Sequence, residues 1–177
     1  FRTFLVMMLF ITGSNVIYAG EDLQATIGTP ASKGSWDGTK NEYSWKERTD
    51  NLMPIFTGLK GKLNTDYVAL KFTTKNYVKD QPYRVCFMEE GKTTPTAEIP
   101  FYSDGVKDLA FAIREELKNK DLSQVDKILL GGFSTSGSIT LDPNSIVLVG
   151  QLQNNTQRYD LSKFVLTNQG ANVQSAT

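Results

Sequence analysis

The side chains that most often carry catalysis are scarce in this sequence. Its 177 residues include no histidine and one cysteine, Cys86. Without an imidazole there is no Ser-His-Asp triad, and one thiol cannot assemble a His/Cys zinc site. The run 132–137 (Gly-Phe-Ser-Thr-Ser-Gly) spaces its glycines one residue too far apart for a nucleophile elbow. We therefore expect a protein that is not an enzyme, with no metal and no cofactor.

Carboxylates are the remaining candidates for acid–base chemistry. Two adjacent pairs occur, Glu89 with Glu90 and Glu115 with Glu116. Glycoside hydrolysis needs two carboxylates that face each other across a sugar, and neighbouring residues in a strand or helix point in different directions. Neither pair forms that arrangement by itself, so solvated surface is the simpler interpretation. An exported hydrolase with carboxylates from separate segments stays the weakest of three functional hypotheses.

The beginning of the chain predicts export. Arg2 precedes an apolar run from Thr3 to Thr12, and Ala19 followed by Gly20 offers a cleavage site. This is the pattern of a secretory signal peptide over residues 1–19, whereas a membrane anchor would need about 20 apolar residues. We expect a single domain over residues 20–177 with 18 basic and 19 acidic residues. Near neutrality argues against nucleic acid as a partner, because its phosphates require a clustered positive field.

Alternating apolar residues predict a mainly β fold. Residues 67–72 and 82–88 alternate with period two, which places Arg84 and Cys86 on the opposite face from Tyr83 and Val85. We expect Cys86 to be a small buried side chain rather than a reactive thiol. A hairpin is predicted between 138–141 and 146–152 across Asp-Pro-Asn-Ser, and 158–167 is a further candidate strand. Short strands separated by turns indicate a β-sandwich.

One segment has a different period. Between residues 104 and 119 apolar side chains recur at steps of three and four, among them Leu109, Ile113 and Leu117. This spacing predicts an inserted amphipathic helix of three to four turns with its apolar stripe packed on the sandwich. Binding of the stripe to a partner is the alternative.

Three features near the amino terminus carry a family resemblance. Residues 22–28 alternate apolar and polar side chains, residues 42–46 read Glu-Tyr-Ser-Trp-Lys, and residues 54–58 read Pro-Ile-Phe-Thr-Gly. Together they resemble the disulfide-free, kappa-class fimbrial subunits that the chaperone–usher pathway of Gram-negative enteric bacteria assembles.

This resemblance implies a fold and a function. Such subunits have an immunoglobulin-like β-sandwich that lacks its last strand, and the resulting groove is filled first by a periplasmic chaperone. At the outer-membrane usher, the donor segment of the next subunit replaces the chaperone. In this chain the donor segment is expected at residues 21–29, with Leu23, Ala25 and Ile27 as donor residues. The protein is then a structural or minor subunit of a cell-surface fimbria, and host adhesion is a further expected role.

Two alternatives stay open at the sequence level. The segment 21–29 can be the ordinary first edge strand of a complete sandwich. The aromatic residues Trp36, Tyr43 and Trp45 can be plain core, although Trp36 in its Ser-Trp-Asp-Gly setting can also stack on a host glycan. The competing function is accordingly a stand-alone exported β-sandwich that binds a carbohydrate or a protein.

Overall fold

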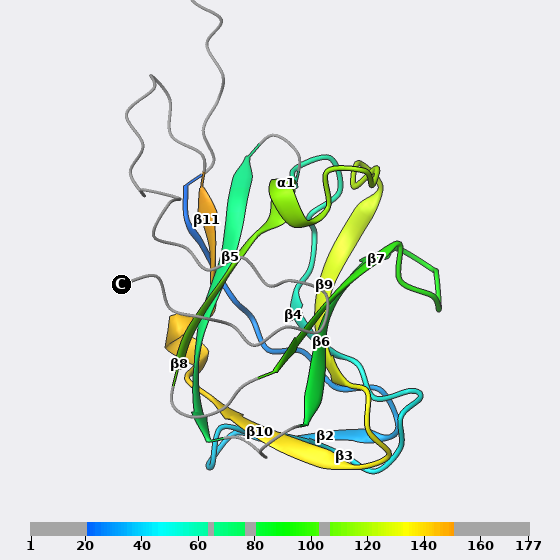
Figure 1. The fold of residues 1–177 in the computed structure, drawn as a ribbon, viewed down its shortest axis with the longest axis vertical. Coiled ribbons are helices and arrows are strands. Elements are labelled where there is room, and N and C mark those ends of the chain that lie inside the picture. Colours follow the sequence, from blue (N-terminus) through cyan, green and yellow to red (C-terminus); the bar gives the residue numbers. More distant parts are fainter. Residues whose placement is uncertain (1–20, 64–65, 77–80, 103–106, 151–177) are drawn as a thin grey trace, which may run out of the picture.

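Two antiparallel β-sheets make up most of the described structure (Figure 1). The computed structural model describes residues 21–63, 66–76, 81–102 and 107–150. The predicted signal peptide and the candidate strand 158–167 lie outside these residues. The mainly β, sandwich-like fold expected from the alternating sequence is confirmed.

The larger sheet has seven strands in the described part of the chain. Their order is β1-β11-β5-β10-β3-β2, with β8 on the other edge of β5. Their bounds are Leu23–Gln24 (β1), Gly34–Asp37 (β2), Glu42–Trp45 (β3), Tyr67–Asn76 (β5), Lys107–Ala112 (β8), Gly137–Leu141 (β10) and Val147–Gly150 (β11). In Figure 1, β2, β3 and β10 run across the lower end of the molecule.

The smaller sheet has the order β4-β9-β6-β7. Its strands are Met53–Phe56 (β4), Pro82–Glu89 (β6), Ala97–Tyr102 (β7) and Val125–Gly132 (β9). The period-two pattern of residues 82–88 predicted β6 well, because its alternate residues Tyr83, Val85 and Phe87 are fully buried against the other sheet.

Aromatic side chains join the two sheets. Trp45 of β3 meets the ring of Tyr83 of β6 edge-on with centroids 5.8 Å apart, and Tyr83 stacks on Phe101 of β7 at 5.4 Å. Phe101 in turn contacts Phe72 of β5 and Phe111 of β8 at 5.6 and 5.4 Å. No disulfide is available to hold this fold, because the sequence has one cysteine, so apolar packing of this kind supplies most of its stability.

The predicted hairpin between 138–141 and 146–152 is wrong. β10 and β11 do not pair with each other, and both pair with β5, along the same edge. Between them lies a 3₁₀ turn, Pro143–Ser145, which carries the chain forward instead of reversing it. The turn replaces the missing ladder bonds, because Asp142 N–H donates to Thr73 O (3.0 Å) and Thr73 N–H donates to Ser145 Oγ (2.7 Å). A ten-residue β5 is long enough to accommodate both strands.

The predicted helix over 104–119 is also wrong. Residues 107–112 form strand β8, and the helix α1 covers only Ile113–Glu116. β8 pairs with β5 from Ala69↔Ala112 to Thr74↔Lys107. The expected burial of Leu109, Ile113 and Leu117 is nevertheless confirmed. The helical pattern omitted Phe111, which is fully buried among the core aromatics and shares a period-two face with Leu109.

Candidate functional site

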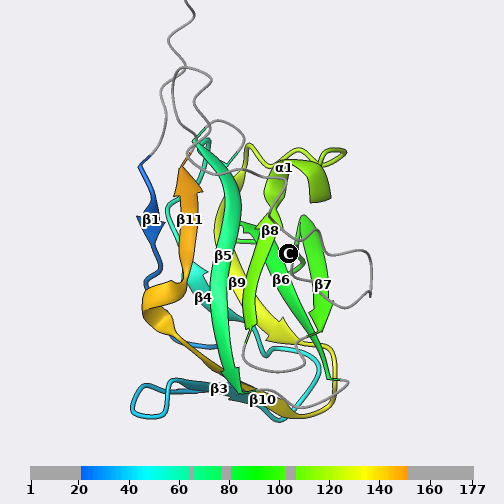
Figure 2. The same cartoon turned by 60° about the vertical axis from the view of Figure 1, so that its left-hand side comes forward.

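The segment from Asp22 to Ala31 connects the edges of the two sheets. It begins as β1 beside β11, as Figure 2 shows, and then runs along β4 of the smaller sheet. Its main-chain N–H groups donate to both: Ala25 to Ile146 O (2.9 Å), Thr26 to Ile55 O (3.1 Å), Gly28 to Pro54 O (2.8 Å) and Ala31 to Leu52 O (2.9 Å). We call the space between β11 and β4 that this segment occupies the edge slot.

Alternate side chains of the segment point into the edge slot. Leu23, Ala25 and Ile27 are partly buried and pack against the main core, which is the face that the sequence assigned to a donor strand. On the other face, Gln24 Nε2 donates to Pro143 O and Ile146 O, both at 3.1 Å. The segment is therefore paired within its own chain, in the arrangement of a first strand. Its exchange between copies stays a prediction.

The three aromatic residues considered for ligand stacking lie mainly in the core. Tyr43 is 0% and Trp45 2% exposed, so neither offers an open ring face. Burial also raises the pKa of the Tyr43 phenol. Trp36 lies in strand β2 and not in a loop, and it is partly buried against the same core. Packing, rather than glycan stacking, accounts for Tyr43 and Trp45.

The glycine- and serine-rich run 131–137 forms a close contact with Trp45. Trp45 Nε1 donates to Ser134 O at 3.1 Å. A methyl group at Gly132 would lie 2.0 Å from Cζ2 of Trp45, so only glycine fits beneath the indole. The Ser134 hydroxyl accepts a bond from Gln81 Nε2 (2.6 Å) and donates to Ser136 O (3.0 Å). The run that superficially resembles a nucleophile elbow is therefore a packing element.

Cys86 is buried on the outer side of the smaller sheet. Its side chain is fully inaccessible and its Sγ lies 3.7 Å from Glu98 Oε1. Burial raises the pKa of this thiol, so the neutral form is favoured. The prediction of a small buried side chain is confirmed in its geometry.

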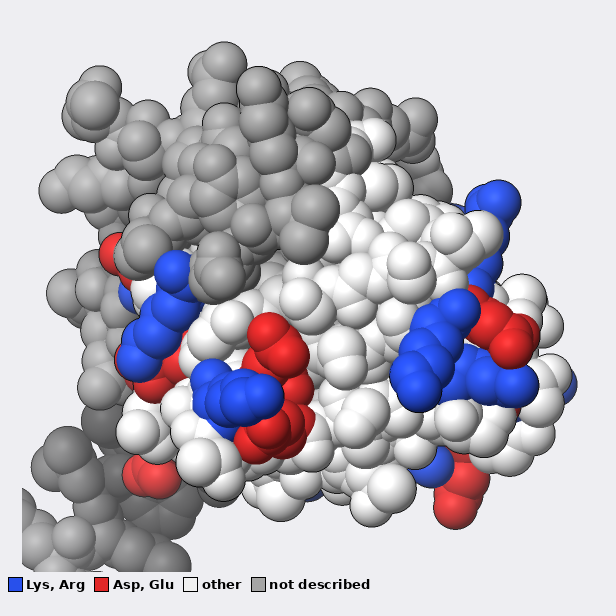
Figure 3. Space-filling model, turned by 90° about the horizontal axis from the view of Figure 1, so that it is seen from below, with Lys and Arg blue, Asp and Glu red and all other residues white. Residues whose placement is uncertain are grey.

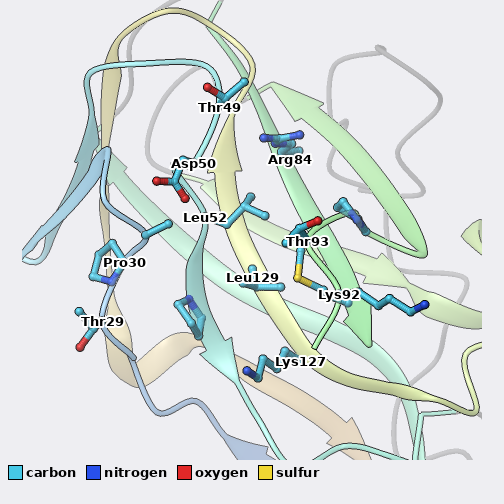
Figure 4. A pocket seen from close by; sticks show the side chains of 14 residues that line it. Thr29, Pro30, Thr49, Asp50, Leu52, Arg84, Lys92, Thr93, Lys127 and Leu129 are labelled. Atoms are coloured by element: carbon cyan, nitrogen blue, oxygen red, sulfur yellow. The ribbon is translucent and has the colours of Figure 1, made fainter. Parts of the chain in front are cut away.

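A hollow lies on this same outer side, and sequence reasoning missed it. Its floor is the second apolar cluster, in which Met88 and Leu129 pack with Cys86 and partly buried Leu52. The hollow has a volume of about 600 Å³, and Figure 4 shows residues of four chain segments around it. We call it the outer groove. Its remaining lining residues are Thr29, Pro30, Ala31, Thr49, Asp50, Pro54, Arg84, Lys92, Thr93, Pro95 and Lys127.

The sequence did contain one signal for the outer groove. In β6 the face opposite the core carries Arg84, Cys86 and Met88, and two of these three are apolar. A sheet face that meets water normally alternates to polar residues, so two apolar residues there indicate that something covers them. The segments that form the walls come from distant parts of the chain, and no local pattern predicts their meeting.

Charges of both signs are mixed on the lower face of the molecule. Figure 3 shows groups in which basic side chains lie beside acidic ones. A wide uncharged area separates these mixed groups from one another. Among the described ion pairs, Lys33 Nζ lies 3.0 Å from Glu47 Oε1 and Lys40 Nζ 3.6 Å from Asp37 Oδ2. In its described part, this face has no broad basic surface of the kind that phosphate backbones require.

Comparison with known proteins identified no relative of this chain. No protein-family model, no curated protein and no solved structure matches the chain. Within the described ranges, no helix is long and apolar enough to cross a membrane, and no three metal-binding side chains come together. The function must therefore be inferred from the edge slot, the outer groove and the sequence.

Proposed function

We propose that this chain is an exported subunit of a bacterial surface fimbria that assembles by strand exchange. One observation carries the proposal: the expected donor segment 21–29 fills the edge slot with Leu23, Ala25 and Ile27, and main-chain hydrogen bonds from Ala25 to Ala31 hold it there. In a fibre the same segment of one copy would occupy the edge slot of the next.

Strand addition of this kind uses two separate sources of specificity. Main-chain hydrogen bonds supply affinity, and alternate side chains determine the register. The edge slot already accepts this sequence in its own chain, so it is complementary to the same segment of a second copy. Gly28 suits the close approach to β4, because a methyl group there would lie 3.1 Å from Cβ of Pro54.

The remaining parts of the proposal follow from the family resemblance. They are an immunoglobulin-like strand arrangement, export through the periplasm, a periplasmic chaperone that holds the edge slot before assembly, and an outer-membrane usher. Other fimbrial subunits are then the principal partners, and a host glycan is a further ligand of the assembled fibre.

A disulfide that holds the segment in its own slot tests the proposal. Because Ala25 N–H bonds to Ile146 O, the adjacent pair Gln24↔Val147 is a non-hydrogen-bonded pair, with Cα atoms about 4.5 Å apart. This separation suits a disulfide. Gln24 is exposed, so Gln24→Cys with Val147→Cys disturbs little packing, and buried Cys86 does not compete.

The readout is uptake of a fluorescent peptide of residues 21–31, together with the oligomeric state at rising protein concentration. We expect the unmodified protein and the reduced double variant to take up the peptide and to form head-to-tail multimers. The oxidised variant should do neither. A peptide with Ile27→Asp is the matched control and should not bind. An unmodified protein that stays monomeric and excludes the peptide would contradict the fimbrial proposal.

A second candidate function has its own supporting observation. The segment 22–31 is already docked in a single copy, and the outer groove offers a concave apolar surface. Both suit a stand-alone exported β-sandwich that binds a ligand. Loss of stability on deletion of residues 21–31, in a protein that never exchanges strands, favours this candidate.

A further inference from the structure

The outer groove is lined by apolar residues where a sandwich normally exposes polar ones. Leu52, Met88 and Leu129 form its floor on the outer side of the smaller sheet. The segment Thr29–Ala31 forms one wall, and the turn that carries Lys92, Thr93 and Pro95 forms another (Figure 4). A volume of about 600 Å³ falls within the range of small-molecule sites, which bury an apolar ligand body.

Basic groups from three separate elements surround this floor. Arg84 lies on β6, Lys127 on β9 and Lys92 in the turn after β6. Neither lysine has a carboxylate within 4.0 Å among the described residues. Asp50, the one acidic residue in the described lining, accepts a hydrogen bond from the Ser32 hydroxyl. The charge around the outer groove therefore favours an anion.

Arg84 is held in place by its neighbours, and its Nη2 donates to the main-chain oxygen of Arg48 at 3.4 Å. Its Nη1 lies 3.0 Å from Glu98 Oε1, and its guanidinium carbon lies 5.0 Å from the centroid of the Phe133 ring. The buried Nε has no hydrogen-bond partner among the described residues. The guanidinium is therefore fixed at the edge of the outer groove, where it shares its charge with Glu98.

We propose that the outer groove binds a small organic anion with an apolar body, such as a medium-chain carboxylate. The apolar body lies on Leu52, Met88 and Leu129, and the anionic group lies at the basic rim. The described lining includes no aromatic side chain, so a neutral sugar would lack a stacking platform. Residues 29–31 form a wall of the outer groove and also belong to the segment that fills the edge slot, so the groove is complete while that segment is docked, whichever copy supplies it.

Calorimetric titration of the protein with octanoate, octanol and octylammonium tests this proposal. Octanoate should bind best, and its affinity should fall as salt rises because Lys92 is exposed and Lys127 partly exposed to solvent. Lys127→Gln and Lys92→Gln should each weaken octanoate binding about two- to fivefold and leave octanol unaffected. Lys118→Gln, whose side chain is exposed and does not line the groove, is the matched control and should bind like the unmodified protein.

A variant of the floor separates the apolar contribution from the charge. Leu52→Ser should weaken octanoate and octanol alike, and its thermal unfolding shows whether the fold is retained. Octanol or octylammonium binding as tightly as octanoate would overturn the assignment to an anion. Failure of all three probes to bind at millimolar concentration, or unchanged binding in both lysine variants, would overturn the proposal as a whole.

Discussion

Replacement of Gly132 by alanine should destabilise the protein strongly, because its Cα lies directly under the Trp45 indole. A methyl group there would lie 2.0 Å from Cζ2, 2.2 Å from Cε2 and 2.7 Å from Nε1 of Trp45. No real contact is that short, so the indole must move. Trp45 is 2% exposed and stacks on Tyr43 with centroids 5.4 Å apart, which leaves it little room.

The expected cost combines two destabilising effects and one smaller stabilising effect. Overpacking of a dense core costs about 1–3 kcal/mol. Displacement of the indole also breaks the 3.1 Å bond from Nε1 to Ser134 O, and a buried donor without a partner costs about 1–3 kcal/mol. Alanine reduces the entropy of the unfolded chain and so offsets about 0.4–1 kcal/mol. We expect a net loss of about 2–4 kcal/mol in the free energy of unfolding.

Urea unfolding monitored by tryptophan fluorescence measures this loss. Gly38→Ala is the matched control, because a methyl group there meets only Nε1 of Trp36, at an ordinary 3.5 Å. Trp45→Phe should relieve part of the clash, so a double-mutant cycle should show coupling between positions 45 and 132. A cost below about 0.5 kcal/mol for Gly132→Ala would refute the packing that we describe.

The remaining predictions concern one core residue, one thiol and one strand connection. Leu109→Ala should lower the free energy of unfolding by about 2–5 kcal/mol, because this side chain is 1% exposed. Chemical denaturation measures this loss, and an unchanged denaturation midpoint would place Leu109 at the surface. Thiol labelling of native Cys86 should be slow and become fast on unfolding, and rapid native labelling would contradict its burial. Because the pKa of the folded thiol is raised, its contribution to stability is fully present below about pH 8.5, where the unfolded thiol titrates, and declines as pH rises above it. Cys86→Ala should flatten that decline. Ser145→Ala removes the acceptor of Thr73 N–H and should cost about 1–2 kcal/mol by urea unfolding, whereas no cost would mean that β10 and β11 are joined differently.

Some of the candidate site was visible in the sequence. The alternation of Leu23, Ala25 and Ile27 correctly indicated one apolar face, and the structure places that face against the main core. What the segment faces was not visible, because the edge slot is built from β11 and β4, far away in the chain. The outer groove was missed for the same reason, since its floor and walls meet only in the folded chain.

Period two by itself was sufficient for the half-buried strands. Tyr83, Val85 and Phe87 of β6 and Leu70 and Phe72 of β5 lie in the main core, as strand geometry predicts, although Ala69 and Cys86 between them are buried as well. Composition alone also excludes an internal disulfide, because a single cysteine has no partner in its own chain.

Tertiary structure decided where local patterns were ambiguous. Residues 107–112 satisfy helical and strand periods at once, and pairing with the open edge of β5 selected the strand, because it buries Phe111 and satisfies the backbone hydrogen bonds. Residues 142–145 suit a reversing turn as well as a forward 3₁₀ turn. The length of β5 selected the forward turn, because one edge of β5 pairs with β10 before the turn and with β11 after it. In both places the local pattern does not distinguish the conformations, and long-range pairing with β5 determines the outcome.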